Sequence, residues 1–239
     1  MQKKHDVMPS AGCSGFQPQR RFWLKAVMVA PLAGPWLAQA QSPTRIKIVA
    51  ASNLKFVLAD LANQYRQQTG IQVDVNLGAS GNLARQILQG LPVEQFISAD
   101  EVWVAELAKA GRTVDAGQRY ATGRLALWSK QVNMVDDKGE VLRSNSFNKI
   151  AIADPKLAPY GIAAMEVITK LGVQGSVIPK LVQGESIGQT YQFVSTENAQ
   201  LGFVALSQIS VDGRITQGSA WVVPQHLHAP LKQDAVLLN

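Results

Sequence analysis

The stretch RIKIVAASNLKFVLADLANQYRQQTGIQVDVNLGAS, residues 45–80, decides the fold class. Residues 45–50 (RIKIVA) and 71–76 (IQVDVN) have the patterns of β-strands. Between them, apolar residues recur at helical spacing at Leu54, Val57, Leu58, Leu61 and Tyr65. Gly70 suits the left-handed position that ends a helix. Strand, helix and strand in this order predict a parallel sheet covered by helices.

The same alternation continues to the end of the chain and predicts helices on both faces of the sheet. Further helices are expected after residues 78–80 (with Leu83, Ile87 and Leu88 on one face), at 101–110, at 161–171 and at 186–197. Further strands are expected at 93–99, 124–129, 149–153, 201–205, 220–223 and 233–238. The polar stretch 136–148 is expected to be a surface loop.

The first forty residues have the pattern of a signal peptide. Five basic residues precede the apolar segment 26–37 (AVMVAPLAGPWL), and Ala38-Gln39-Ala40 matches the small-x-small cleavage pattern. A membrane span needs about 20 apolar residues, which this segment does not reach. We therefore expect an exported, soluble protein, cleaved after Ala40.

The run RRFWLK, residues 20–25, resembles the twin-arginine export consensus. The modest hydrophobicity of segment 26–37 also favours that route. An ordinary Sec signal that contains Arg20 and Arg21 is the alternative, and both routes stay open.

Cleavage would change the charge of the protein. The chain has 23 basic and 17 acidic residues, a net charge of +6. The signal contains five of the basic and one of the acidic residues, so the mature net charge is +2. The basic balance therefore does not indicate a nucleic-acid surface. Cys13, the only cysteine, lies in the signal, which excludes disulfides and thiol catalysis in the mature chain.

Three predicted strand-to-helix junctions combine small residues with hydroxyl or amide side chains and contain no charge: 50–53 (AASN), 78–82 (GASGN) and 158–161 (APYG). A fourth candidate is the helix start at 186–188 (SIG). Such junctions lie at the carboxyl ends of parallel strands, where ligands bind. A helix start presents unpaired N–H groups that can hold an anion. Any one of these junctions is also an ordinary helix cap, and composition alone names no ion.

Five strings carry a resemblance to a known family: AASNLK (50–55), GASGNLARQI (78–87), FISAD (96–100), ADPKLAPYG (153–161) and LGFVALS (201–207). Together they resemble the molybdate-binding proteins of ABC transporters (ModA). The resemblance implies an α/β fold of the type II periplasmic-binding class, with two doubly wound lobes joined by crossing hinge strands. The implied lobes are residues 41–124 plus 232–239, and residues 125–231.

The resemblance also implies the ligand and its site. The ligand would be molybdate or tungstate, held by neutral donors and delivered to an ABC permease by a periplasmic monomer without a cofactor. By motif, the anion would be bound by Ser52, Asn53, Ser80, Tyr160 and the backbone N–H of Ile187.

Two features depart from some family members. Those members place a tyrosine near Ala205 and a small residue near Tyr160, and this chain has the reverse. Members also continue with a helical segment after the strand that ends near Leu238, whereas this sequence stops at Asn239.

Other polar and aromatic residues have simpler interpretations. We expect Arg85 to form a structural ion pair and Asp100 to cap a helix. His226 and His228 could share one face of a strand, but the sequence around them lacks further metal ligands, so no metal site is expected. The three tryptophans at 103, 128 and 221 are expected to pack in the core or an interface.

Two alternatives remain. The same fold could bind sulfate or another tetrahedral oxyanion. Amino acids are disfavoured, because no junction offers the basic and acidic pair that a zwitterion needs. An exported enzyme is the second alternative, but the mature chain has only His226 and His228 as bases, and neither Ser52 nor Ser80 lies in a Gly-x-Ser-x-Gly turn.

Overall fold

The computed structural model describes residues 44–144 and 146–239. The predicted signal peptide, with Arg20, Arg21, Cys13 and the cleavage site after Ala40, lies outside the described residues. Within the described ranges, no helix is long and apolar enough to cross a membrane.

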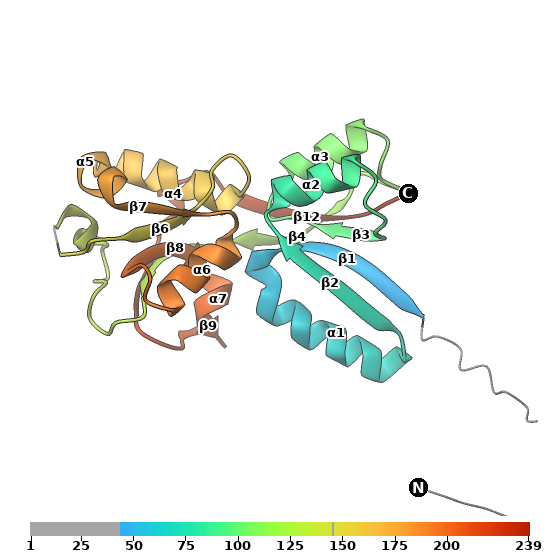
Figure 1. Ribbon diagram of the computed structural model, residues 1–239, viewed down its shortest axis with the longest axis horizontal. Coiled ribbons are helices and arrows are strands. Elements are labelled where there is room, and N and C mark those ends of the chain that lie inside the picture. Colours follow the sequence, from blue (N-terminus) through green and yellow to red (C-terminus); the bar gives the residue numbers. More distant parts are fainter. Residues whose placement is uncertain (1–43, 145) are drawn as a thin grey trace, which may run out of the picture. The chain divides into compact units, whose positions relative to one another are not determined.

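The first of two five-stranded sheets has the strand order β2-β1-β3-β12-β4 (Figure 1). Its strands are β1 (Arg45–Ala51), β2 (Gln72–Gly78), β3 (Gln95–Ile97), β4 (Gln118–Gly123) and β12 (Leu231–Leu237). β1 is parallel to β2 and β3, whereas β12 is antiparallel to both β3 and β4. The last strand of the chain therefore completes the sheet that the first strand begins.

Three helices cover this sheet: α1 (Lys55–Thr69), which continues the short helix η1 (Ser52–Leu54), α2 (Ser80–Leu88) and α3 (Val102–Lys109). On one face, Leu83 and Ile87 of α2 and Val104 and Leu107 of α3 pack around Phe96. This apolar packing fixes the start of α2 beside the end of β2.

The other face is only partly covered by α1. Of the five apolar positions expected to face inward, Leu58 is buried, but Val57, Leu61 and Tyr65 are 39–51% exposed. An apolar groove of about 380 Å³ therefore remains open between α1 and the sheet, lined mainly by Ile46, Ile48, Leu58, Leu61, Ala62, Tyr65, Val73, Val75 and Ile97. The predicted amphipathic face exists, but only part of it is used for packing.

The second sheet has the strand order β11-β5-β8-β6-β7. Its strands are β5 (Leu125–Ser129), β6 (Ile150–Ala153), β7 (Leu181–Gly184), β8 (Leu201–Ala205) and β11 (Ser219–Val222). β6 is parallel to β7 and β8, and β5 is antiparallel to β8 and β11. Its helices are α4 (Pro159–Lys170), α5 (Gln174–Val177) and α6 (Ile187–Ser195). Short elements complete this part: η2 (Glu140–Arg143), η3 (Ile178–Lys180), α7 (Leu206–Ile209), β9 (Ser210–Val211), β10 (Arg214–Ile215) and η4 (Gln225–Leu227).

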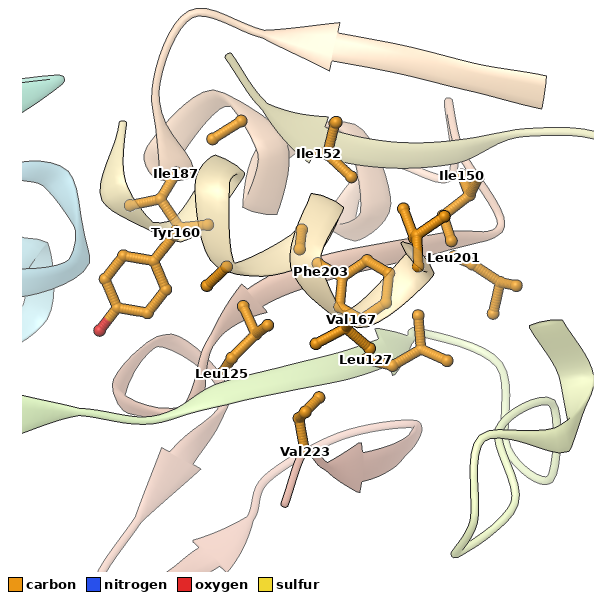
Figure 2. Packing of buried hydrophobic residues seen from close by; sticks show 14 of the residues in the cluster. Leu125, Leu127, Ile150, Ile152, Tyr160, Val167, Ile187, Leu201, Phe203 and Val223 are labelled. Carbon is orange, nitrogen blue, oxygen red and sulfur yellow. The ribbon is translucent and has the colours of Figure 1, made fainter. Parts of the chain in front are cut away.

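The largest apolar cluster lies between this sheet and α4. Leu125, Leu127, Ile152 and Phe203 pack against Val167, and Tyr160 lies at the edge with its hydroxyl oxygen pointing away from the apolar side chains (Figure 2). This placement frees the phenol for polar contacts. On the opposite face, Trp128 stacks on Tyr191 of α6, with ring centroids 5.4 Å apart.

Several predictions about individual elements need correction. Both sheets are mixed, not parallel throughout, and β4 and β7 were not expected. The stretch 136–148 is not simply a surface loop, because Val141, Leu142 and Phe147 are buried in the large cluster. Asp136 supports this turn by accepting hydrogen bonds from three backbone N–H groups.

The predicted fold class is confirmed: the chain forms two mixed α/β sheets of five strands each. The chain passes from the first sheet to the second between Gly123 and Leu125 and returns to the first in β12. The exact lobe bounds, 41–124 plus 232–239 and 125–231, stay a prediction.

Candidate functional site

All five residues predicted to bind the anion are buried. The relative exposure is 5% for Ser52, 3% for Asn53, 1% for Ser80, 2% for Tyr160 and 3% for Ile187. Buried polar groups need hydrogen-bond partners, so the contacts of each residue show what it can still offer to a ligand.

The two serines use their hydroxyl groups differently. The Oγ of Ser52 donates to the carbonyl oxygen of Gly78 at 3.0 Å, which ties η1 to the end of β2. The Oγ of Ser80 accepts a hydrogen bond from the N–H of Ala99 at 3.0 Å. The Ser80 hydroxyl therefore keeps its own proton for another acceptor, whereas Ser52 must turn its hydroxyl or use its backbone N–H.

Asn53 and Tyr160 are connected through Gln233 of β12. The Nε2 of Gln233 donates to the Tyr160 hydroxyl oxygen at 3.0 Å, and the Nδ2 of Asn53 donates to Gln233 Oε1 at 3.4 Å. The Oδ1 of Asn53 is buried and has no hydrogen-bond partner in the described residues. This amide oxygen needs a donor such as water, whereas an anion could accept from the backbone N–H of Asn53.

Ile187 begins α6, where the first N–H groups of a helix have no partner inside the helix. Ser186 caps this helix by accepting from the N–H of Gln189 at 3.3 Å. Gln208, 5% exposed, donates from Nε2 to the Ile187 carbonyl oxygen at 3.3 Å and accepts from Ala205 N at 3.1 Å. The start of α6 is thus held in place by a buried amide.

Contacts between elements of the two sheets bring these junctions together. The Oγ of Ser207 donates to the Asn53 carbonyl oxygen at 2.9 Å, and the N–H of Gly81 donates to the Leu157 carbonyl oxygen at 3.0 Å. Gly188 of α6 lies directly against Ser52. The four uncharged junctions noticed in the sequence therefore meet where the two sheets face each other.

The interior is electrically neutral. Among the described residues, no lysine, arginine, aspartate or glutamate is buried, and the buried polar residues are Ser52, Asn53, Ser80, Ser98, Ser129, Thr190, Gln208, His228 and Gln233. Burial raises the pKa of the Tyr160 phenol well above its ordinary value, although the hydrogen bond from Gln233 opposes this effect. At neutral pH the phenol therefore keeps its proton and is a hydrogen-bond donor.

The structure also shows the contacts of two charged residues to which the sequence assigned no part in ligand binding, Asp100 and Arg85. Asp100 accepts from the Trp103 N–H at 3.2 Å, which confirms its capping role. Partial burial raises the pKa of this carboxyl above its ordinary value, against the lowering effect of the hydrogen bonds it accepts. Arg85 is exposed on α2, and no ion pair of it is found in the part of the chain that the structure describes, so the expected ion pair stays a prediction.

His226 and His228 do not lie together on a strand. His226 lies in η4 and is exposed, whereas His228 is 4% exposed with its Nδ1 2.7 Å from the Ala229 carbonyl oxygen. Within residues 44–144 and 146–239, no group of three or more His, Cys, Asp or Glu side chains could hold a metal ion. Trp128 and Trp221 are buried in the second sheet's packing, as predicted, and Trp103 packs against the α2–α3 cluster.

Sequence reasoning missed three polar residues that support the site: Ser207, Gln208 and Gln233. Ser207 and Gln208 follow the LGFVA strand, and the first of them lies within a string already noticed for its resemblance. Gln233 carries no such signal, because it is a single polar residue in the strand LKQDAVL.

Comparison with known proteins agrees with this architecture. A family model described as "Bacterial extracellular solute-binding protein" matches residues 46–239. The chain is 46% identical to the molybdate-binding protein ModA of Azotobacter vinelandii over 220 residues, which cover 91% of this chain and 86% of that protein. It is 44% identical to ModA of Rhodobacter capsulatus over 205 residues, covering 85% and 79% of the two chains.

A solved structure is also similar. The periplasmic molybdate-binding protein of Azotobacter vinelandii superposes with a TM-score of 0.78 at 38% identity, covering 81% of this chain and 85% of that one. With a family model over most of the chain and these relatives, the chain belongs to the bacterial extracellular solute-binding proteins, within the ModA family of transport components that bind their solute without catalysis.

Proposed function

We propose that this protein captures molybdate or tungstate outside the cytoplasmic membrane and delivers it to an ABC permease. The observation that carries the proposal is the meeting of four uncharged strand-to-helix junctions at one buried place, with donors from elements of both sheets. Ser52, Asn53, Ser80, Tyr160 and the backbone N–H of Ile187 are the proposed ligands. The names of the ModA relatives supply the identity of the anion.

Neutral donors suit a buried dianion. An anion that leaves water loses its hydration, and hydrogen bonds from the protein must offset this loss of free energy. A hydrogen bond to a charged acceptor contributes about 1.5–3 kcal/mol, so several donors that converge on one anion stabilise it without a cationic side chain. Helix starts add the positive ends of their dipoles. The absence of a buried basic residue among those described agrees with this mode of binding.

The same donors explain selectivity. A fully deprotonated tetrahedral dianion accepts from every donor, whereas the proton of hydrogenphosphate turns one of its oxygens into a donor within a site made mostly of donors. Sulfate has the required charge but is smaller, so some donors would lie too far from its oxygens. We therefore expect molybdate and tungstate to bind better than sulfate, and sulfate better than phosphate.

Equilibrium binding of the purified mature protein tests the proposal. Molybdate, tungstate, sulfate and phosphate should each be titrated at the same pH and ionic strength, with thermal unfolding followed by circular dichroism. A ligand that binds the native state raises the unfolding midpoint, so molybdate and tungstate should raise it and phosphate should not. If sulfate raises the unfolding midpoint as much as molybdate does at equal concentration, the molybdate assignment is wrong and the sulfate alternative replaces it.

The remaining parts of the proposal concern transport. The signal peptide is cleaved after Ala40, so the mature chain begins at Gln41 and acts as a monomer in the periplasm. Residues 41–124 with 232–239 form one lobe and residues 125–231 the other. The permease partner follows from the family, because extracellular binding proteins of ABC transporters deliver their ligand to a membrane component.

A further inference from the structure

Gln233 occupies an unusual position for a glutamine. It is 2% exposed, lies in β12 between β3 and β4, and is hydrogen-bonded at both ends of its amide group. The pairing of β12 with β4 shifts register between Gln233 and Asp234. Such an irregularity changes the direction of a side chain relative to a regular strand, so the local backbone helps to aim the amide.

The space around the amide is provided by Gly123. A Cβ atom built on Gly123 would stand 2.5 Å from Gln233 Nε2 and 2.6 Å from the Tyr160 hydroxyl oxygen. No side chain fits there while the amide and the phenol stay in contact. The glycine is required for space and not for backbone conformation, since its φ lies outside the left-handed region.

The donor and the acceptor of each hydrogen bond around Gln233 can be assigned in turn, starting from the Asn53 amide. Asn53 donates to the oxygen of the Gln233 amide, which leaves the nitrogen to face Tyr160. Gln233 then donates to the phenol oxygen, so this oxygen is already an acceptor. Among the hydrogen bonds of the described residues, the Tyr160 hydroxyl donates to no protein acceptor, and its proton is left for a ligand.

We propose that Gln233 is a positioning residue that fixes the Tyr160 hydroxyl as a donor to the bound oxyanion and thereby discriminates against protonated oxyanions. The inference rests on the proposed function and adds a residue that does not touch the ligand. With Gln233 donating to its oxygen, the phenol is oriented to donate outward, which disfavours a hydrogen bond from the proton of hydrogenphosphate to the same oxygen. The raised pKa of Tyr160 supports the same role, because the phenol stays protonated.

The test measures the affinities of molybdate and inorganic phosphate for four proteins: the wild type, Gln233→Leu, Tyr160→Phe and the double variant. Gln233→Leu should weaken molybdate binding about threefold to tenfold, the range of one ordinary hydrogen bond. It should also lower the ratio of molybdate to phosphate affinity by about tenfold, because the phenol can then turn and accept a hydrogen bond from hydrogenphosphate.

The double variant separates positioning from packing. If Gln233 acts through the phenol, Gln233→Leu should cause no further loss of molybdate affinity in the Tyr160→Phe background. Gln118→Leu, the same change at an exposed position of β4, is the matched control and should bind both anions like the wild type. Losses that simply add in the double variant, with an unchanged molybdate-to-phosphate ratio, would overturn the inference.

Two further variants keep the test decisive if Gln233→Leu does not fold. Gln233→Glu preserves the shape but accepts a hydrogen bond from the phenol and adds a negative charge, so it should weaken molybdate binding more than tenfold. Gly123→Ala should separate the amide from the phenol and reproduce the altered ratio. Wild-type affinity in both would refute the positioning role. A wild-type protein that binds no molybdate would instead refute the proposed function itself.

Discussion

Gly188, the second residue of α6, lies so close to Ser52 that a Cβ atom built on it would stand 2.8 Å from the Ser52 Cβ and 3.2 Å from its Oγ. The two residues belong to elements beside different sheets, η1 and α6. Ser52 is itself a proposed ligand of the anion, and Gly188 follows another, Ile187. A glycine at this position therefore allows the two helix starts to approach each other.

Gly188→Ala should weaken molybdate binding and lower the stability of the protein without ligand by no more than about 2 kcal/mol. The added methyl group overpacks the contact with Ser52, at a cost of about 1–3 kcal/mol, whereas alanine favours the helix over glycine by about 1 kcal/mol. Titration with molybdate and thermal unfolding measure the two effects. Gly175→Ala is the control, because a Cβ there meets no atom within 4 Å. Undiminished affinity in Gly188→Ala would show that this approach does not matter for binding.

Tyr160→Phe should weaken molybdate binding about tenfold to a hundredfold. The variant loses only the phenol oxygen, and a hydrogen bond to a charged acceptor contributes about 1.5–3 kcal/mol. Gln233 also loses its acceptor, so the unfolding midpoint without ligand should fall by about 2–4 °C for each kcal/mol lost. Isothermal titration and circular dichroism measure both quantities. If molybdate affinity does not change, the phenol serves only to pack the start of α4.

The exchange of Tyr160 with Ala205 tests the geometry of the site. Both residues are buried in the same apolar cluster, and Ala205 is completely inaccessible to solvent. Tyr160→Ala should weaken molybdate binding at least as much as Tyr160→Phe, because it also opens the site to water. Adding Ala205→Tyr should recover part of this loss if the two positions face the same oxygens of the anion.

Overpacking beside β8 is the main risk of this exchange, so the unfolding midpoint of the double variant must be measured as well. A stable double variant that binds no better than Tyr160→Ala would show that the two positions face different parts of the site.

Asp100 should make folding stability depend on pH. Its pKa is raised in the folded chain, mainly by desolvation, so the folded state holds this proton more tightly than the unfolded state. The contribution to stability is therefore present below the ordinary pKa and is lost as pH rises through the raised value. Asp100→Asn keeps the cap and should flatten this part of the pH profile while leaving stability at pH 7 equal or higher.

Chemical denaturation at a series of acidic to neutral pH values checks this prediction, and Asp100→Ala provides the comparison. The alanine variant loses the cap and should be less stable by about 0.5–2 kcal/mol. If Asp100→Asn is clearly less stable than the wild type at neutral pH, the hydrogen bonds to the carboxylate outweigh its desolvation.

Replacement of Arg20 and Arg21 by lysine tests the export route. A twin-arginine signal should fail with two lysines, so the precursor should accumulate in the cytoplasm at its normal expression level. Cell fractionation and the mass of the exported protein would show this and would also locate cleavage after Ala40. Unchanged export of the variant, with dependence on the Sec motor, would favour the ordinary signal.

The sequence predicts the fold well where packing is local. The strand 45–50 and the helix starting near Leu54 are visible because apolar spacing records which face is covered. β4 was missed because its residues QRYATG are mostly exposed and show no apolar alternation. The antiparallel direction of β12 was also invisible, since the pattern of one strand does not show which neighbour it pairs with.

For the site, too, the sequence predicts local motifs but not contacts between distant parts of the chain. The junctions at Ser52 and Ser80 could be recognised because each is a short motif at a predicted helix start. Gln233 could not, because its partner Tyr160 lies 73 positions earlier in the chain and an isolated glutamine in a strand normally faces solvent. Its role depends on a contact between elements of the two sheets, which only the folded chain shows.

The apolar groove beside α1 affects how the stability of this protein should be measured. Its walls, including Ile46, Leu61 and Tyr65, are open to solvent in the folded chain, and exposed apolar surface attracts fluorescent hydrophobic dyes. A dye-based melting assay would therefore start from a high signal, and the dye would stabilise the folded state by mass action. Tryptophan fluorescence avoids both effects, because Trp128 and Trp221 are buried in the second sheet's packing and report directly on its unfolding.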